Sequence, residues 1–166
     1  MRDFEEAVRR GPDRATHYLN YSRLFALAKE WPAADSVLAR GLVHIRGVEA
    51  IPLLLEKARV CNEQEEAAMG LEAADEVLAL SPENGRALYQ RGWALGMLGR
   101  LREAESSMSQ LVRQEPDNKS AAAALNRLIA ALPAQPRTEA TPPPQSRTER
   151  PAVDFAAQVK PWWKFW

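Results

Sequence analysis

This sequence of 166 residues has few of the features that mark catalytic, secreted or membrane-spanning proteins. Cys61 is its one cysteine, which excludes an internal disulfide and leaves a zinc site without a second thiolate. Lysine plus arginine and aspartate plus glutamate number 22 each, so no overall charge attracts nucleic acid, and no nucleic-acid partner is expected. No apolar run approaches the length of about 18 residues that would cross a bilayer.

Residues that could carry catalysis are also scarce. The two histidines, His17 and His44, lie far apart with no cluster of ligands around them. No glycine-rich phosphate loop and no nucleophile–base pair occur, so we expect no enzyme activity, no catalytic residue, no metal and no cofactor. The charged opening, residues 1–6, does not resemble a secretory signal and favours a cytoplasmic location, and the alanine- and arginine-rich usage is typical of bacteria with GC-rich genomes.

The sequence does contain a short helix-breaking motif that occurs twice. Pro82 and Pro116 lie 34 positions apart, each between polar or acidic residues and a following Asn. Between them, a helix-compatible run extends to Leu98, Gly99 interrupts it, and a second run reaches the next proline. A period of this length indicates a helical hairpin that buries its apolar face only by stacking on neighbours of the same kind.

This unit, residues 85–118, resembles the tetratricopeptide repeat (TPR), a helix–turn–helix module. Eight residues match the family's pattern of bulky, small, turn and proline positions: Leu88, Gly92, Leu95, Gly99, Ala104, Met108, Leu111 and Pro116. The resemblance implies an all-α, right-handed superhelical array of about three TPR-like hairpins with a capping helix. Small residues such as Gly92 and Ala104 would let paired helices approach closely.

The same spacing divides the rest of the chain. Residues 1–133 are expected to form the repeat domain: a partial repeat at 1–14, repeats at 15–50, 51–84 and 85–118, and a capping helix at 119–132. The opening segment supplies only a second helix. Two accounts of it stay open, a natural short helix covering the next hairpin or the loss of repeats upstream.

One block departs from the family's pattern. The 15–50 block is two residues longer than the others, with Arg46 where a proline is expected, so its second helix or the loop around 44–47 should be lengthened. We also expect Trp31 and Pro32 to occupy a turn. The Glu-rich segment 62–68 reads as the solvated end of a hairpin.

Binding to a protein or peptide is the function that the resemblance implies, because the first helices of such repeats line a concave groove. Three arginines among the groove positions favour a ligand with acidic groups, although the family's carboxylate clamp of lysine and asparagine is not reproduced. The predicted groove residues are Asn20, Arg23, Glu56, Arg59, Arg86, Tyr89, Gln90 and Trp93.

The end of the chain has a different composition. Residues 134–159 are rich in proline and polar residues and are expected to be a disordered linker. The last segment, 160–166, holds three of the five tryptophans, and its anchor residues are Trp162, Trp163, Lys164, Phe165 and Trp166. Amphipathic rings on a tether suit a pocket in a second partner, a membrane surface, or the groove of the same chain or of a second copy.

The sequence therefore predicts a scaffold or adaptor, with a groove for one protein and an aromatic tail for another. The alternative is a peripheral membrane or cell-envelope assembly factor anchored by residues 160–166.

Overall fold

The computed structural model describes residues 2–12 and 14–132 of the chain. Within these ranges all regular secondary structure is helical, which confirms the all-α array expected from the sequence. The elements are α1 (Arg2–Arg10), α2 (Ala15–Leu27), α3 (Trp31–His44), the 3₁₀ helix η1 (Gly47–Ala50), α4 (Ile51–Glu63), α5 (Ala67–Leu80), α6 (Gly85–Met97), α7 (Leu101–Gln114) and α8 (Lys119–Ala131).

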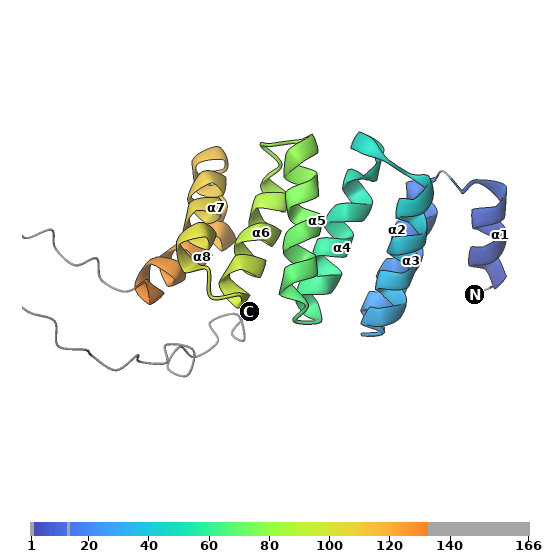
Figure 1. Ribbon diagram of the computed structural model, residues 1–166, viewed down its shortest axis with the longest axis horizontal. Helices are drawn as coiled ribbons and strands as arrows, with labels where there is room; N and C mark the ends of the chain where they lie inside the picture. Colours follow the sequence, from blue (N-terminus) through green and yellow to red (C-terminus); the bar gives the residue numbers. More distant parts are fainter. Residues whose placement is uncertain (1, 13, 133–166) are drawn as a thin grey trace, which may run out of the picture.

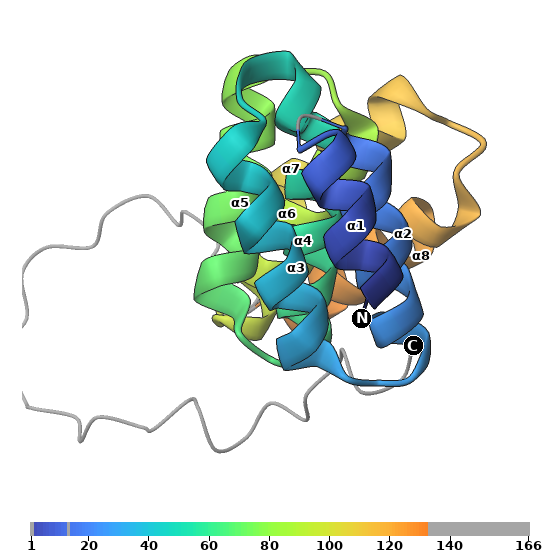
Figure 2. The same ribbon diagram turned by 90° about the vertical axis from the view of Figure 1, so that its right-hand side faces the viewer.

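The helices follow one another in sequence order along one axis (Figure 1). The pairs α2/α3, α4/α5 and α6/α7 form antiparallel hairpins, and each hairpin packs on the next. Helices α1 and α8 lie at the two ends of the array, and Figure 2 looks along it with α1 nearest the viewer. Every substantial helix contact is therefore local in the sequence, as expected for a stacked repeat.

The three hairpin turns share one backbone conformation. Lys29, Glu65 and Gly99 have positive φ values of 59°, 62° and 72°. In each turn the following amide donates to the carbonyl five residues earlier, as from Arg100 to Leu95 at 2.8 Å. Glycine adopts this conformation without strain, whereas the other two side chains resist it. The predicted Trp31 and Pro32 turn is wrong, because both residues begin α3 after the turn at Lys29.

The extra length of the first repeat forms η1. Helix α3 ends at His44, and the chain then passes through Gly47 (φ 63°) into a 3₁₀ turn before α4 begins. Gly47 has the left-handed backbone that glycine permits, so the insertion lengthens the connection rather than the helix. This agrees with the expected irregularity around residues 44–47.

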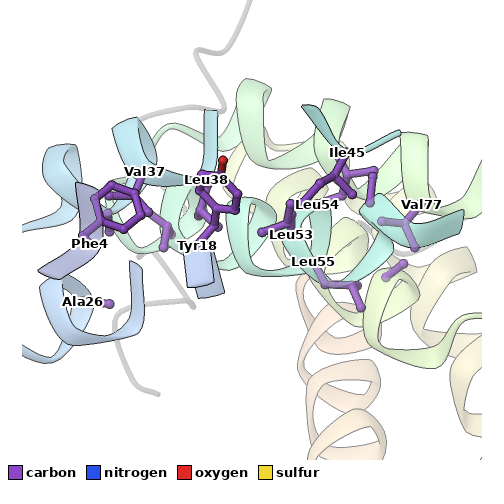
Figure 3. Close-up of a cluster of buried hydrophobic side chains, with 14 residues drawn as sticks. Phe4, Tyr18, Ala26, Val37, Leu38, Ile45, Leu53, Leu54, Leu55 and Val77 are labelled. Carbon is purple, nitrogen blue, oxygen red and sulfur yellow. The ribbon is translucent and has the colours of Figure 1, made fainter. Parts of the chain in front are cut away.

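The core runs through the hairpins as a row of buried clusters rather than a single centre. One buried cluster extends from Phe4 to Val77 across successive helices (Figure 3), and a second joins α6, α7 and α8. Close helix contact depends on small residues: a Cβ added to Gly92 would lie 2.7 Å from Met108 Cε. The eight pattern positions named above thus include the residues that hold a hairpin together.

The array has two layers. Helices α2, α4 and α6, here called the inner layer, contact one another in succession. Helices α3, α5 and α7, the outer layer, pack mainly on the inner helices on either side. Because the inner helices contact one another directly, they form one continuous face of the stack.

Candidate ligand-binding surface

The predicted groove residues all lie on the inner layer. Asn20 and Arg23 are exposed on α2, and Arg86 is exposed at the start of α6. Arg59 of α4 is half-buried. The side chains of Tyr89, Gln90 and Trp93 on α6 are also half-buried, and Glu56 of α4 is the one buried member of the set.

Glu56 is the centre of a charged cluster that joins two hairpins. Its side chain is 4% exposed, and it accepts a 2.6 Å hydrogen bond from Arg59 Nη2, one turn later in α4. Arg23 Nε, from α2, lies 3.9 Å from the other carboxylate oxygen. The two guanidinium groups remain partly exposed, so the buried carboxylate holds them at the surface with one net positive charge.

The α6 part of the surface is aromatic. The Tyr89 and Trp93 rings are one turn apart, with centroids 6.2 Å from each other and planes tilted by 52°. Burial raises the pKa of the Tyr89 hydroxyl to about 12, and the charge of Arg127 on α8 opposes this shift only in part. Tyr89 therefore stays neutral at any physiological pH, as a hydrogen-bonding ring beside the second aromatic ring.

Three of the predicted residues also share a pocket. It has a volume of about 300 Å³ and lies where α6, α7 and the start of α8 meet. Arg86, Tyr89 and Gln90 line one side, and the sequence reasoning missed the residues that complete it. These are Gly85, Leu111, Glu115, Asn118 and Ser120. The candidate surface thus divides into the Glu56 cluster on α2 and α4 and this α6 pocket.

A second pocket lies on the outer side, next to the inserted turn. Its volume is about 260 Å³, with Leu42, Ile45 and Leu54 among the apolar lining residues. The charged residues that line it include Lys57, which pairs with Asp35 at 3.2 Å. Nothing in the sequence pattern indicated this pocket, because its lining combines residues of α3, α4 and α5 with Ala50 of the inserted turn.

One buried polar residue was misplaced by the sequence reasoning. Asn62 is 5% exposed, although the segment 62–68 was expected to be solvated. Ala67 is buried as well, while Glu63, Glu65 and Glu66 are exposed. Because three of the seven residues are charged, the pattern did not indicate that Asn62 and Ala67 are buried.

Three further expectations concern metal ions, membranes and the C-terminal segment. Among the described residues there is no group of three or more His, Cys, Asp or Glu side chains placed to hold a metal ion. No helix within the described ranges has both the length and the apolar character needed to span a bilayer. The predicted linker, 134–159, and the anchor residues Trp162, Trp163, Lys164, Phe165 and Trp166 lie outside the described residues.

Comparison with known proteins shows the fold. No family model matches the sequence, and no curated protein matches it. Among solved structures, the second TPR domain of human RPAP3, in complex with an HSP70 peptide, superimposes with a TM-score of 0.62 at 19% identity, covering 68% of this chain and 92% of that one. The TPR domain of Arabidopsis OM64 gives 0.63 at 20%, covering 69% and 93%.

MamA gives a TM-score of 0.69 at 13% identity, covering 78% of this chain and 74% of that one. The three similarities agree on the arrangement of the helices, although the sequences have diverged widely. The chain therefore has the fold of TPR domains, as the resemblance of residues 85–118 implied.

Proposed function

We propose that this protein is a non-enzymatic interaction module that binds an acidic segment of another protein across its inner layer. The observation that carries this function is the placement of Arg23 and Arg59 by Glu56. A buried carboxylate is costly unless it is paired. Here it orients two guanidinium groups from successive hairpins toward solvent, which is an arrangement suited to carboxylate groups on a ligand.

The aromatic part of the surface, on α6, would supply the apolar contacts of the same interaction. Tyr89 and Trp93 offer ring surface, and side chains of these types contribute strongly to protein interfaces. An extended ligand would then place acidic groups near the Glu56 cluster and an apolar side chain near α6. The HSP70 peptide held by the RPAP3 domain has the sequence SGPTIEEVD, and this supports a peptide-binding role for the shared fold.

The C-terminal segment is assigned a separate role in this proposal. Residues 1–133 would form the repeat domain, 134–159 a linker, and 160–166 an anchor that engages a second protein. A flexible linker of this length has a root-mean-square span of roughly 30 Å, enough to reach beyond the domain. Two binding sites joined in this way would make the protein an adaptor.

Binding at the inner layer is tested with fluorescently labelled peptides and the full chain. A set of peptides rich in Asp and Glu is compared with matched peptides in which Gln and Asn replace the acids. We expect the acidic set to bind more tightly and to lose affinity as salt is added. Arg23→Ala should weaken that binding by about three- to tenfold, because the partly desolvated ion pair between Arg23 and an acidic side chain of the peptide is lost.

The matched control is Arg102→Ala, because Arg102 is exposed on the outer layer. It should leave the affinity unchanged. Equal binding of acidic and neutral peptides, or equal effects of the two arginine variants, would contradict the proposed surface.

The anchor is tested by deleting residues 160–166. Loss of one soluble partner from a pull-down, with vesicle binding absent in both forms, supports the adaptor. Vesicle binding that disappears with the deletion would instead favour the membrane or cell-envelope assembly role. The peptide-binding experiment should give the same result in both forms, because the inner layer does not include the deleted residues.

A further inference from the structure

Four helices can be compared residue by residue. Helices α2, α4, α6 and α8 are each 13 residues long and occupy equivalent places in the array. A residue at the same step along each helix should therefore face the same kind of neighbour. Differences in exposure at one step reveal where a neighbouring helix is missing.

The tenth residue of these helices faces the preceding hairpin. The third residue of α4, Leu53, lies on that side, since a Cβ added to Gly41 of α3 would be 3.1 Å from Leu53 Cδ1. The tenth residue follows it by two helical turns on the same face. In α4, α6 and α8 this residue is fully buried, at 0% exposure for Val60, Ala94 and Leu128.

The same step in α2 is open to solvent. Leu24 is 59% exposed, and Leu27, almost one turn further along, is 81% exposed. Within the described residues α2 has α1 on this side, but no inner-layer helix precedes it. Leu24 therefore marks an unfilled place for a helix of the inner type.

The eleventh residue faces the second helix of its own hairpin. Gly92, the eighth residue of α6, lies against Met108 of α7, and the eleventh is on the same side of the helix. At this step Cys61 and Leu95 are 0% exposed, whereas Ile129 of α8 is 53% exposed. No described helix of the outer type covers Ile129, which therefore marks a place for one.

Helix α1 is itself of the outer type. Phe4 precedes Pro12 by the spacing that separates Met108 from Pro116, and both Phe4 and Met108 are 1% exposed. Arg40 of α3 donates to Glu5 at 2.8 Å and 3.1 Å, which also ties α1 to the first hairpin. One end of the described array thus has an outer-type helix beside an unfilled inner place, and the other end has the reverse (Figure 1).

We propose that copies of this chain stack head to tail, with α8 of one copy and α1 of the next forming a hairpin shared by two molecules. Helix α8 would cover Leu24 and Leu27 of the second copy, and α1 of that copy would cover Ile129. The new contact continues the stacking interface that already joins α2, α4 and α6. The occupant is therefore specified by the repeat itself.

Two features set the strength and form of this assembly. Asn126, the eighth residue of α8, is polar, and α1 has nine residues where the outer helices have 14, so the contact is weaker than stacking within the chain. A buried polar eighth residue is nevertheless compatible with the fold, because Ser22 of α2 is fully buried. The two surfaces differ, so the contact is heterologous and leaves both outer ends open for further copies.

The test uses the full chain and measures its mass by light scattering over about a hundredfold range of concentration. The wild-type mass should rise with concentration beyond that of a dimer. Leu24→Arg and Ile129→Arg should each weaken the association at least tenfold, since every contact needs both surfaces. An equimolar mixture of the two variants should form dimers and stop there, because each retains one intact surface.

Val43→Arg and Leu98→Arg are the controls, because both side chains are exposed and lie elsewhere, at 64% and 42%. Both should associate like the wild type, and thermal unfolding should show that all four variants are folded. A wild-type chain that stays monomeric overturns the proposal. So does a loss of association with Leu24→Arg but not Ile129→Arg, which indicates a symmetric pair, or a loss only on deleting 160–166. None of these readouts depends on a ligand.

Discussion

Asn62 of α4 and Gln90 of α6 are joined by two hydrogen bonds. Asn62 Nδ2 donates to the Gln90 backbone oxygen at 3.1 Å and to its Oε1 at 2.9 Å. The amide thereby connects successive inner helices and fixes the Gln90 side chain at the edge of the α6 pocket. Asn62 Oδ1 is buried without a hydrogen-bond partner among the described residues, and it faces the space that a side chain at Gly70 would occupy.

Gly70→Ala should destabilise the protein for this reason. The new Cβ would lie 2.1 Å from Asn62 Oδ1 and 3.3 Å from the Ala58 backbone oxygen. Asn62 could move away from this Cβ only by breaking its hydrogen bonds to Gln90. We therefore expect the free energy of unfolding, measured in urea, to fall by about 1–3 kcal/mol, despite the better helix propensity of alanine. In an Asn62→Ala background the same substitution should cost much less.

Gly92→Ala provides the comparison. Its Cβ would meet the flexible end of Met108, with Cε at 2.7 Å, so repacking should offset most of the strain. A Gly70→Ala variant as stable as Gly92→Ala would show that the Asn62 contact does not constrain the backbone.

The Glu56–Arg59 pair should respond asymmetrically to mutation. Arg59→Ala leaves a carboxylate at 4% exposure with only Arg23 nearby, at 3.9 Å. We expect a loss of about 1–3 kcal/mol. Glu56→Gln releases two guanidinium groups that already reach solvent, and it should change stability by less than about 1 kcal/mol. Urea unfolding of both variants measures the two changes in the free energy of unfolding. Equal losses would contradict the burial of the carboxylate beside partly exposed guanidinium groups.

Cys61 gives the stability a dependence on alkaline pH. Burial raises the pKa of its thiol from 9.0 to about 12, with the charge of Asp35 acting in the same direction. Above pH 9 the unfolded chain loses this proton while the folded chain keeps it. The stabilisation is therefore complete below pH 9 and decreases as the pH rises, by up to about 1.4 kcal/mol per unit.

Cys61→Ala should remove part of this slope, whatever its cost at neutral pH. Unfolding of both proteins on either side of pH 9 provides the measurement. Tyr89, with its own raised pKa, contributes in the same direction and remains in both proteins. An unchanged slope would mean that the thiol ionises as readily in the fold as outside it.

Asn118 should stabilise the last helix as its N-cap. Its Oδ1 accepts a 3.0 Å hydrogen bond from the Ala121 amide. Asn118→Ala should cost about 1 kcal/mol and speed hydrogen exchange in α8 before it affects α4. Asn126→Ala is the control, because an exposed asparagine inside the helix gains propensity when replaced by alanine and should be neutral or slightly stabilising.

The helices and their order could be predicted from the sequence because the signal is local and repeated. Gly99, Pro82 and Pro116 end or interrupt helices through effects that act within a few residues. Lys29 and Glu65 adopt the same left-handed turn without a glycine, and the Trp31–Pro32 turn was misplaced for that reason. At those two turns the packing of the flanking helices overrides the residue preference.

The surface was less accessible to sequence reasoning. Spacing placed Glu56 with the groove residues, but it did not indicate the pairing with Arg23, which comes from another hairpin. Asn62 was hidden by the surrounding glutamates, and its partner Gln90 lies 28 residues away. Side-chain pairing between hairpins depends on the rotation of each helix about its axis, which the periodic pattern defines only to within a residue or so.

The local pattern of helix contacts has a mechanical consequence. A force applied to the two ends of the array would act on each hairpin junction in turn. Among the described helices, substantial contacts join only helices that are close in the sequence. Such a molecule extends like a spring, by small changes at each junction. The Asn62–Gln90 hydrogen bonds and the Glu56–Arg23 ion pair would resist separation of neighbouring inner helices. The stiffness would therefore vary along the stack.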